Sequence, residues 1–379
     1  MNVMNLTHSE QIRQVPSRAL ILGIAGLVIT GLWLFTDRAQ FFQAYLAAYI
    51  FWSGISLGCV LMLMAHNMSG GYWGFTMRRF LEAGASALPL IAVLFLPIAL
   101  GLHDLYPWAD SSAVAASAVM THRQAFLNPP FFLLRAAAYL IIWIAFGLAA
   151  IRTRRAGLNA LGLILYVLTI TLASVDWVMS IEDQWYSTIY GVLYLTGDVI
   201  GAMAFLIGAL YLLRRIAPLA DEVKPRLTGD LGNLLLGFIM AWAYVAFMQL
   251  LVIWSGNIVE EIRWYISRIQ NGWQILALGV AGLGFVLPFV MLLFARYKQH
   301  IHKLVLVAGI ALLSRLVDSF WLVLPAFPDA GLGLLLPGLL AVIGIGGLWV
   351  ALFARYLNKN GLMASEVEAV GTEVQQHAG

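Results

Sequence analysis

Charged residues are scarce in this sequence. Of its 379 residues, only 11% are Asp, Glu, Lys or Arg, whereas 61% are hydrophobic and the mean hydropathy is +0.86. Soluble domains carry about a quarter charged residues, so a water-soluble globular domain is excluded. Intrinsic disorder is excluded as well, because apolar surface this abundant cannot stay hydrated. The composition therefore indicates an integral membrane protein.

Cysteine is almost absent. The single Cys59 excludes an intrachain disulfide, an iron–sulfur cluster held by this chain alone and a CxxCH haem attachment. A b-type haem would need histidines that face each other within spans, but the histidines outside the two tails fall at expected helix ends or in loops: His66, His103, His122, His300 and His302. Walker A and dinucleotide fingerprints are also missing. The sequence thus predicts neither a metal nor a bound cofactor in this chain, and no redox chemistry by it unaided.

Ten apolar stretches are long enough to span a bilayer, since a hydrocarbon core of about 30 Å needs about 20 apolar residues. They cover roughly residues 18–36, 41–65, 79–101, 130–151, 157–178, 188–213, 230–255, 272–295, 302–325 and 331–354. The runs are continuous rather than alternating, which predicts an all-α polytopic membrane protein. The first run lacks a small-residue cleavage site and is expected to be a retained anchor. The expected organisation is an N-tail at 1–17, a membrane domain at 18–355 and a C-tail at 356–379.

The distribution of Lys and Arg predicts the orientation. If the N-terminus is cytoplasmic, sixteen of the 22 basic residues fall inside and only four, Arg38, Arg123, Arg263 and Arg268, fall outside. The inside set is Arg13, Arg18, Arg78, Arg79, Arg152, Arg154, Arg155, Arg214, Arg215, Lys224, Arg226, Arg296, Lys298, Lys303, Arg355 and Lys359. The net charge of +3 is explained by this bias and does not indicate a nucleic-acid partner. Both termini are therefore expected in the cytoplasm.

Two external loops are long. Residues 256–271 place Ile258, Ile262, Tyr265, Ile266 and Ile269 on one helical face, with Glu260, Glu261, Arg263 and Arg268 mostly on the other, which suits a helix lying in the membrane interface. In the loop at 102–129, Asp110 and Ser111 form a candidate helix N-cap. These loops are interpreted as short lids over the bundle, with a docking surface for a soluble partner as the alternative.

The two halves of the chain share a pattern. Gly54 and Gly58 match Gly197 and Gly201 at the same spacing, and Asp176 in SVDW matches Asp318 in LVDSFW at nearly that spacing. The long external loops recur in register. We expect two repeated four-helix bundles, helices 2–5 at about 41–178 and helices 6–9 at about 188–325, flanked by helices 1 and 10. The glycine pairs predict close helix approach.

Several ionisable residues lie within the expected spans, where each needs a partner or a purpose. The structural interpretation pairs Arg315 with Asp318 at i,i+3, Arg135 with Asp176, and Glu82 with Arg78 at i,i+4. Asp198 has no cation near it in sequence and favours a proton-relay or cation site. The functional alternative is a proton path through a polar network of Asp176, Arg135, Asp198, Asp318, Arg315 and Glu82.

The segment DWVMSIEDQWYSTIYG at 176–191 resembles the sequence that follows the fifth helix in ActF-type chains, the second large membrane subunits of bacterial alternative complex III. This family belongs to the NrfD/PsrC-like superfamily. The segments RRFLEAGASALPL at 78–90 and NPPFFLLR at 128–135 fit the same family in the same order. The resemblance implies an NrfD-like fold and a role in quinol:cytochrome c oxidoreduction in the bacterial inner membrane.

The resemblance also implies partners. Haem c and iron–sulfur clusters would lie in partner subunits: an iron–sulfur/molybdopterin-like subunit, multihaem cytochrome c subunits and a sister ten-helix subunit. A terminal cytochrome c oxidase is a further candidate partner, and quinone and lipid are candidate ligands. This chain would be a non-redox structural partner of the quinol-oxidising subunit, with a candidate proton path and no catalysis alone.

By the same resemblance, Trp185 and Tyr186 would join Asp176 in a quinone-side cluster near Arg135. The sequence Ile181-Glu182-Asp183-Gln184 stands where relatives commonly have Leu-Asp-Pro-His, and this departure weakens a quinol-oxidising role. The alternative function is a secondary transporter with a mid-membrane carboxylate site. Against it, Pro89 and Pro97 in helix 3 have no clear counterparts in helix 7.

Overall fold

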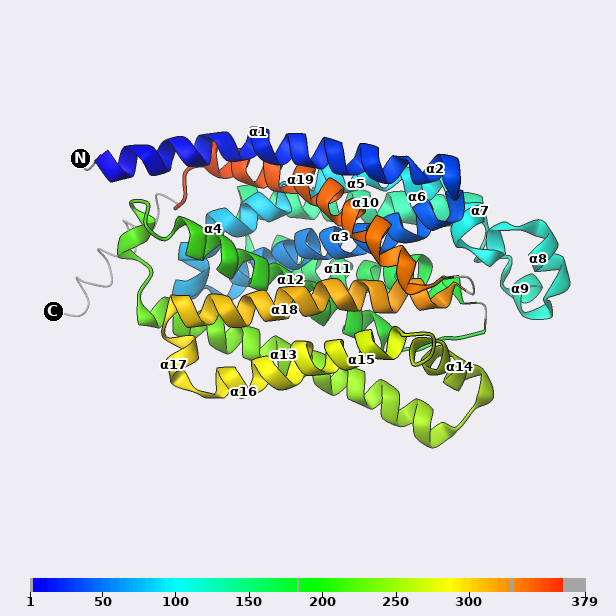
Figure 1. Cartoon of the computed structure of the whole chain (residues 1–379). Coiled ribbons are helices and arrows are strands. Elements are labelled where there is room, and N and C mark those ends of the chain that lie inside the picture. Colours follow the sequence, from blue (N-terminus) through cyan, green and yellow to red (C-terminus); the bar gives the residue numbers. More distant parts are fainter. Residues whose placement is uncertain (1–2, 183, 328–329, 364–379) are drawn as a thin grey trace.

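The computed structural model describes residues 3–182, 184–327 and 330–363, and within them it is all helical. Ten helical segments in this part of the chain are long and apolar enough to cross a membrane, and each end lies within seven residues of its predicted position. Figure 1 shows them as one elongated bundle. The prediction of a ten-span, all-α polytopic protein is confirmed. The C-tail beyond residue 363 and residues 1–2 of the N-tail lie outside the described residues.

The first five spans are built as follows. They are α1 (Val3–Gly31) continued by α2 (Trp33–Thr36); α3 (Arg38–Ser69); α4 (Tyr72–Ala85), α5 (Leu88–Leu94) and α6 (Leu96–Leu100) in series; α10 (Pro129–Arg152); and α11 (Ala156–Trp177), followed by the 3-10 turn η2 (Met179–Ile181). Pro89 and Pro97 each lie at the start of the short helix that follows a break. Proline fits there because the first turn of a helix leaves its backbone N–H groups unpaired anyway.

The second five spans are also helical, with a break in a different place. They are α12 (Tyr190–Leu213); α13 (Pro225–Gly256); α15 (Trp273–Ala281), the π-helix η4 (Gly282–Val286) and α16 (Leu287–Leu293) in series; α18 (Ile301–Val323) with η5 (Leu324–Ala326); and η6 (Leu332–Leu334) with α19 (Leu335–Asn360). The π-helix precedes Pro288, which has no N–H to donate to the preceding turn. The seventh span, in contrast, is one unbroken helix of 32 residues.

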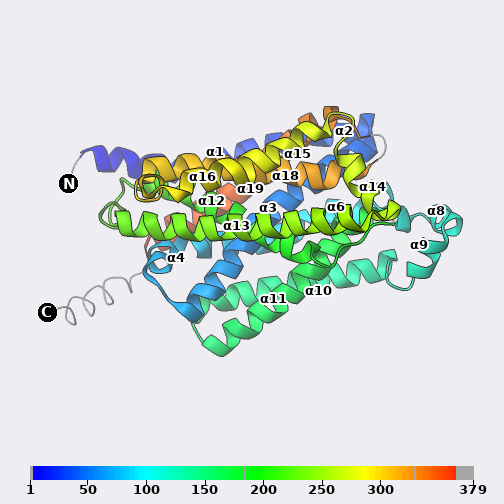
Figure 2. The same ribbon diagram turned by 90° about the horizontal axis from the view of Figure 1, so that it is seen from below.

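The bundle has two distinct ends (Figure 1). One, here called the N-terminal end, carries the start of α1, the end of α19 and the short α17 (Ala295–Lys298). The other, here called the loop end, carries α7 (Leu102–Leu105), η1 (Pro107–Ala109), α8 (Ser111–Ala116), α9 (Ala118–Arg123) and α14 (Val259–Arg268). The remaining 3-10 turn, η3 (Leu219–Asp221), precedes α13. Figure 2 shows α10 and α11 along one side of the bundle, α15 and α16 along the opposite side, and α13 between them.

The helix α3 is the core of the molecule, because nearly every residue in its central part is buried. It crosses α12 closely. A Cβ atom added to Gly54 would collide with the Asp198 carboxylate, and one added to Gly58 would collide with the Asp198 backbone carbonyl oxygen. The close approach predicted from these glycines is confirmed. Gly197 instead leaves room for the Arg315 guanidinium group, and a Cβ on Gly201 would make only an ordinary contact with Ile55.

The external loops match the prediction in part. The side chain of Asp110 accepts a hydrogen bond from the Ser112 backbone N–H and caps α8, as expected. The Ser112 hydroxyl donates to the same carboxylate, and the two hydrogen bonds hold the pKa of the Asp110 carboxyl below its ordinary value. The predicted helix in 256–271 is also present, as α14.

The predicted orientation of α14 is wrong for one residue. Arg268, which was placed on the solvated face, is 1% exposed, and Trp264 beside it on the same face is buried too. These two side chains hold α14 on the bundle. The isoleucines Ile258, Ile266 and Ile269 point outward and are exposed.

Candidate functional site

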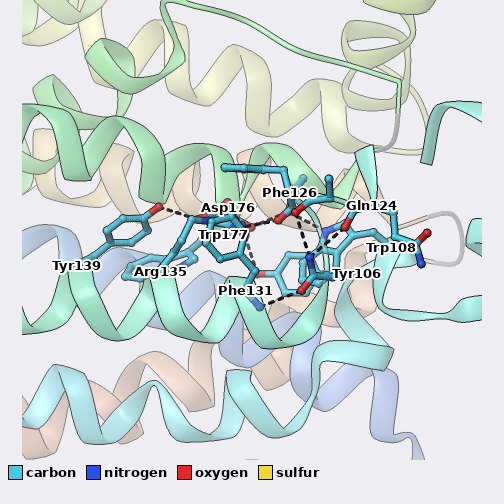
Figure 3. A network of polar contacts seen from close by, with 12 residues as sticks. Tyr106, Trp108, Gln124, Phe126, Phe131, Arg135, Tyr139, Asp176 and Trp177 are labelled. Atoms are coloured by element: carbon cyan, nitrogen blue, oxygen red, sulfur yellow. Dashed lines mark hydrogen bonds and ion pairs between the residues drawn. The ribbon is translucent and has the colours of Figure 1, made fainter. Parts of the chain in front are cut away.

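The first buried ionisable group is an ion pair near the loop end, formed by Arg135 on α10 and Asp176 on α11 (Figure 3). Arg135 Nε and Nη2 donate to the two carboxylate oxygens of Asp176 at 2.8 and 2.7 Å, and the Tyr139 hydroxyl donates to Oδ2 at 2.9 Å. The third arginine nitrogen, Nη1, donates to the Phe126 carbonyl oxygen at 2.7 Å. The predicted pairing of Arg135 with Asp176 is confirmed. Both charges are neutralised and hydrogen bonded, which is the condition for burying them.

Two aromatic residues from the loop between α6 and α10, Tyr106 and Trp108, cover the Arg135–Asp176 pair. The Tyr106 hydroxyl donates to the Trp177 carbonyl oxygen at 2.9 Å, and the Trp108 indole donates to Ser180 Oγ at 3.1 Å. Ser180 Oγ in turn donates to the Asp176 backbone carbonyl oxygen at 2.6 Å. Burial raises the pKa of the Tyr106 phenol well above its ordinary value, and the negative charge of Asp176 adds to the shift. Tyr106 therefore remains a neutral donor.

A second group lies at the centre of the bundle and is named the central cluster: Asp198 on α12, with Arg315, Asp318 and Ser319 on α18, and Tyr194 on α12. Arg315 Nη1 and Asp318 Oδ2 are 2.5 Å apart, which confirms the predicted i,i+3 ion pair. The sequence shows no cation near Asp198, but α18 brings the Arg315 guanidinium group against Gly197, the residue before it.

The Asp198 carboxylate is the unusual member of the central cluster. It is only 7% exposed, and its Oδ2 has no hydrogen-bond partner among the described residues. It borders a cavity of about 20 Å³ that Tyr194, Arg315 and Ser319 also line. A cavity needs roughly 10–15 Å³ to hold one water molecule. The space beside Asp198 can therefore accept a single water, bounded by hydroxyl, guanidinium and carboxylate groups.

Buried tyrosines surround the same carboxylate. Tyr166 on α11 and Tyr194 lie within electrostatic range of Asp198, and the hydroxyls of both lack hydrogen-bond partners in the described part of the chain. The hydroxyls of Tyr49 and Tyr190 are in the same condition. Buried polar groups are normally paired, so the unpaired hydroxyls of Tyr166 and Tyr194 near Asp198 distinguish the central cluster from the saturated Arg135–Asp176 pair.

A third group, the Glu82 cluster, lies on α4 near the N-terminal end. Glu82 pairs with Arg78 at 2.8 Å, as predicted, and also with Arg79 at 2.9 Å. The Tyr356 hydroxyl donates to Glu82 Oε2 at 3.1 Å, and Arg78 Nη1 donates to Asn67 Oδ1 at 2.7 Å. This cluster has two arginines for one carboxylate, whereas the central cluster has two carboxylates for one arginine.

The six residues of the predicted network do not form one chain of direct contacts. As far as the structure describes the molecule, hydrogen bonds and ion pairs join Arg135 with Asp176, and Arg315 with Asp318, but do not link these pairs to each other. Two tyrosines that neighbour these charges, Tyr139 and Tyr194, are not part of the predicted network, although helical spacing would have indicated them. Tyr139 is four residues from Arg135, Tyr194 is four residues from Asp198, and each pair shares one helix face.

The residues assigned to a quinone-side cluster are arranged differently from that expectation. Trp185 is buried and stacks on Trp264 of α14, with ring centroids 4.7 Å apart, while Tyr186 is 59% exposed. The Asp176 carboxylate is fully buried and already accepts three hydrogen bonds. Trp185 packs against α14, Tyr186 is exposed and Asp176 is saturated by Arg135 and Tyr139, so the three side chains do not enclose a quinone between them.

The segment that follows η2 contacts α14 through Glu182 and Gln184. Arg268 Nη1 donates to Glu182 Oε1 at 2.7 Å, Arg268 Nη2 donates to the Leu322 carbonyl oxygen at 2.8 Å, and Arg263 Nη1 donates to Gln184 Oε1 at 3.2 Å. Burial raises the pKa of the neighbouring Tyr265 phenol to about 12. Glu182 and Gln184 thus hold the external helix in place. Asp183 lies outside the described residues.

The fold and these sites define a class: a ten-helix polytopic membrane protein with ionisable groups buried among its helices. No group of three or more potential metal ligands occurs within the described ranges. In comparisons with known proteins, no family model matches the chain, and no curated protein matches it.

Proposed function

We propose that this chain is a non-redox membrane subunit of a respiratory quinol:cytochrome c oxidoreductase of the alternative complex III type, in which the central cluster handles protons. The observation that carries the proton-handling part is the Asp198 carboxylate, buried without its own cation beside a water-sized cavity. The resemblance of residues 176–191 to ActF-type chains supports the assignment to a respiratory complex.

The charge balance of the central cluster supports proton handling. Asp198 and Asp318 share one guanidinium group, which pairs with Asp318. An ionised carboxylate left alone in an apolar interior is very costly, so such a group is neutralised by a proton or by a bound cation. A water in the adjoining cavity would then be the immediate proton donor and acceptor for Asp198.

Depth in the membrane also favours this role. Asp198 is eight residues from the start of α12, or about 12 Å along the helix axis. The Glu82 cluster lies nearer the N-terminal end and the Arg135–Asp176 pair nearer the loop end. In this proposal the two flanking groups lie at the ends of a proton path as fixed charges, and ordered water would carry protons between these ends and Asp198.

The finer organisation belongs to the same proposal. The two halves, at about 41–178 and 188–325, are a repeat of an NrfD-like fold, and the chain lies in the bacterial inner membrane with both termini in the cytoplasm. Its partners are an iron–sulfur/molybdopterin-like subunit, multihaem cytochrome c subunits and a sister ten-helix subunit that oxidises quinol. The excess of arginine at the N-terminal end supports the orientation.

The first test is native purification of the tagged chain in mild detergent, with identification of co-eluting chains and a reduced-minus-oxidised spectrum. Haem c together with iron–sulfur and ten-helix subunits is the expected result. A solitary and spectrally silent protein would contradict the respiratory role. Ion-dependent uptake by that solitary protein in liposomes would make a secondary transporter the better hypothesis.

The second test addresses Asp198 within the purified complex. The nearly isosteric substitution Asp198→Asn removes the titratable proton and should lower quinol-driven proton release in proteoliposomes at least tenfold, with subunit composition unchanged. Asp104→Asn, which changes a partly exposed carboxylate at the loop end, is the matched control. Wild-type proton release by Asp198→Asn would mean that Asp198 only packs the bundle.

A further inference from the structure

A large apolar groove opens between α12, α18 and α19 at the N-terminal end of the bundle. Its volume is about 750 Å³, within the range of roughly 300–1,000 Å³ that is usual for ligand sites. The wall consists of aliphatic residues, glycines and two phenylalanines, Phe205 and Phe353, which pack edge to face at 5.3 Å. Tyr211 is the single lining residue with a polar side chain.

The groove has the length of one membrane leaflet. On α12 its lining residues run from Ala204 to Leu213, a rise of about 14 Å along the helix axis, and Ile216 lines it just beyond the end of α12. Half of a hydrocarbon core is about 15 Å thick. The lining residues of α18 and α19 come from the halves of those helices nearest the same end, from Val305 to Leu312 and from Val350 to Leu357.

The end of the groove at the membrane surface is basic. Tyr211 lies there, with its hydroxyl 3.2 Å from His302 Nδ1 and the Arg214 guanidinium group 3.6 Å above its ring centroid. Arg215 follows and is exposed. Within the described part of the chain, no acidic side chain forms an ion pair with either arginine, so their charge is available to an external anion.

We propose that this groove binds an anionic phospholipid, with an acyl chain along the apolar wall and its phosphate near Arg214, Arg215 and His302. Charge complementarity selects this occupant, because basic pockets between membrane helices on the cytoplasmic side recognise anionic headgroups. The groove fits a quinone less well, because the carbonyl groups of a buried quinone ring need hydrogen-bond donors and Tyr211 is the only polar side chain in the wall. This site is independent of the proposed respiratory role and rests on the proposed orientation, which places this end of the bundle in the cytoplasm.

The test uses the complete purified protein with its co-purifying chains. It is delipidated and then incubated with phosphatidylglycerol or with phosphatidylcholine carrying the same acyl chains, and retained lipid is counted by native mass spectrometry. Wild type should retain one phosphatidylglycerol in preference to phosphatidylcholine. Arg214→Gln and Arg215→Gln should each reduce that preference about fivefold, as expected for about 1 kcal/mol per basic residue.

Groove-filling variants provide the second arm. Gly208 and Gly309 line the groove, and a Cβ on either meets nothing within 4 Å, so Gly208→Leu and Gly309→Leu should fold and exclude the acyl chain. Gly237→Leu adds the same side chain at an exposed and equally open position on α13, outside the groove, and is the matched control for groove filling. The double variant Arg152→Gln with Arg155→Gln removes two exposed arginines elsewhere and is the matched control for the loss of charge. Equal retention of the two lipids, unchanged retention in Gly309→Leu, or recovery of a quinone in place of phospholipid would each overturn the proposal.

Discussion

Asp176 and Asp198 are both aspartates buried among helices, yet their surroundings differ completely. Asp176 receives two hydrogen bonds from Arg135 and one from Tyr139. Asp198 has an unpaired oxygen beside a small cavity. A carboxylate whose acceptor sites are filled by an arginine is fixed as a charge, whereas one bordered by water-accessible space can exchange a proton. The same residue type thus serves stability in one place and is available for chemistry in the other.

The stabilising role of Asp176 can be measured. The substitution Asp176→Asn leaves the Arg135 guanidinium group buried without a counterion, which should lower the free energy of unfolding by about 3–5 kcal/mol. The double substitution of Arg135→Met with Asp176→Leu removes both charges and should recover much of this loss. Thermal unfolding of the purified protein gives the comparison.

The control for that experiment is an exposed pair. Arg38 and Asp104 lie 3.0 Å apart with 59% and 21% of their side chains exposed, so Asp104→Asn should change stability by less than about 1 kcal/mol. If Asp176→Asn were as mild as Asp104→Asn, the buried pair would contribute little to folding and Asp176 would be free for a functional role.

Residue pairs within one helix were predictable, because positions three or four apart share a face. This spacing correctly predicted Arg315–Asp318 and Arg78–Glu82. The burial of Arg268 was not predictable in the same way. Its partners are Glu182 and the Leu322 carbonyl oxygen, which belong to other parts of the chain, so its own helix shows only a cation at a surface-like position.

At the scale of elements, the crossing of α3 and α12 decides how the centre of the bundle is built. Because Gly58 has no Cβ atom, the two backbones approach so closely that a Cβ there would collide with the Asp198 carbonyl oxygen. Small residues are the usual means of bringing membrane helices together, since lipid provides no hydrophobic drive between them. The crossing places Asp198 against α3 and therefore forms one wall of the central cavity.

This crossing predicts unequal effects of two alanine substitutions. Gly58→Ala forces a methyl group into the α12 backbone, which cannot move like a side chain, and should cost about 1–3 kcal/mol of stability. Gly201→Ala makes only an ordinary 3.6 Å contact with Ile55 and should be neutral or slightly stabilising. Melting temperatures of both variants, purified in parallel, test the difference. Equal melting temperatures would mean that the helices are not in close contact at Gly58.

The boundaries of the spans could be predicted from hydropathy because length and apolarity are properties of each segment alone. The interruptions were harder to predict. The third span breaks before Pro89 and Pro97, and the eighth contains the π-helix before Pro288, yet Pro129 and Pro225 simply begin their helices. The effect of a membrane proline depends on whether neighbouring helices satisfy the freed backbone groups, and the sequence of one helix does not contain that information.

At the scale of the whole molecule, the main feature hidden from the sequence is which helices become neighbours. Arg315 lies over a hundred residues from Gly197, and no local pattern predicts that its guanidinium group packs there. The central cluster was therefore only half predictable. The Arg315–Asp318 pair follows from spacing, whereas its meeting with Asp198 follows from the packing of α18 on α12.

The distribution of charge over the whole bundle leads to a prediction about orientation. The start of α1 and the end of α19 lie at the same end, as an even number of spans requires, and the segments between spans at that end hold most of the arginines. The positive-inside rule then predicts that this end lies in the cytoplasm.

Single cysteines introduced at Ser112 in α8 and at Asn360 at the end of α19 report the two sides of the membrane, because the native Cys59 is buried and does not react. A membrane-impermeant maleimide should label Ser112→Cys in intact spheroplasts and Asn360→Cys only after permeabilisation. The reverse pattern would invert the molecule and place the basic groove near Arg214 on the outer leaflet. Labelling of both sites in intact cells would put both outside and mean an even number of spans between them, instead of the expected odd number.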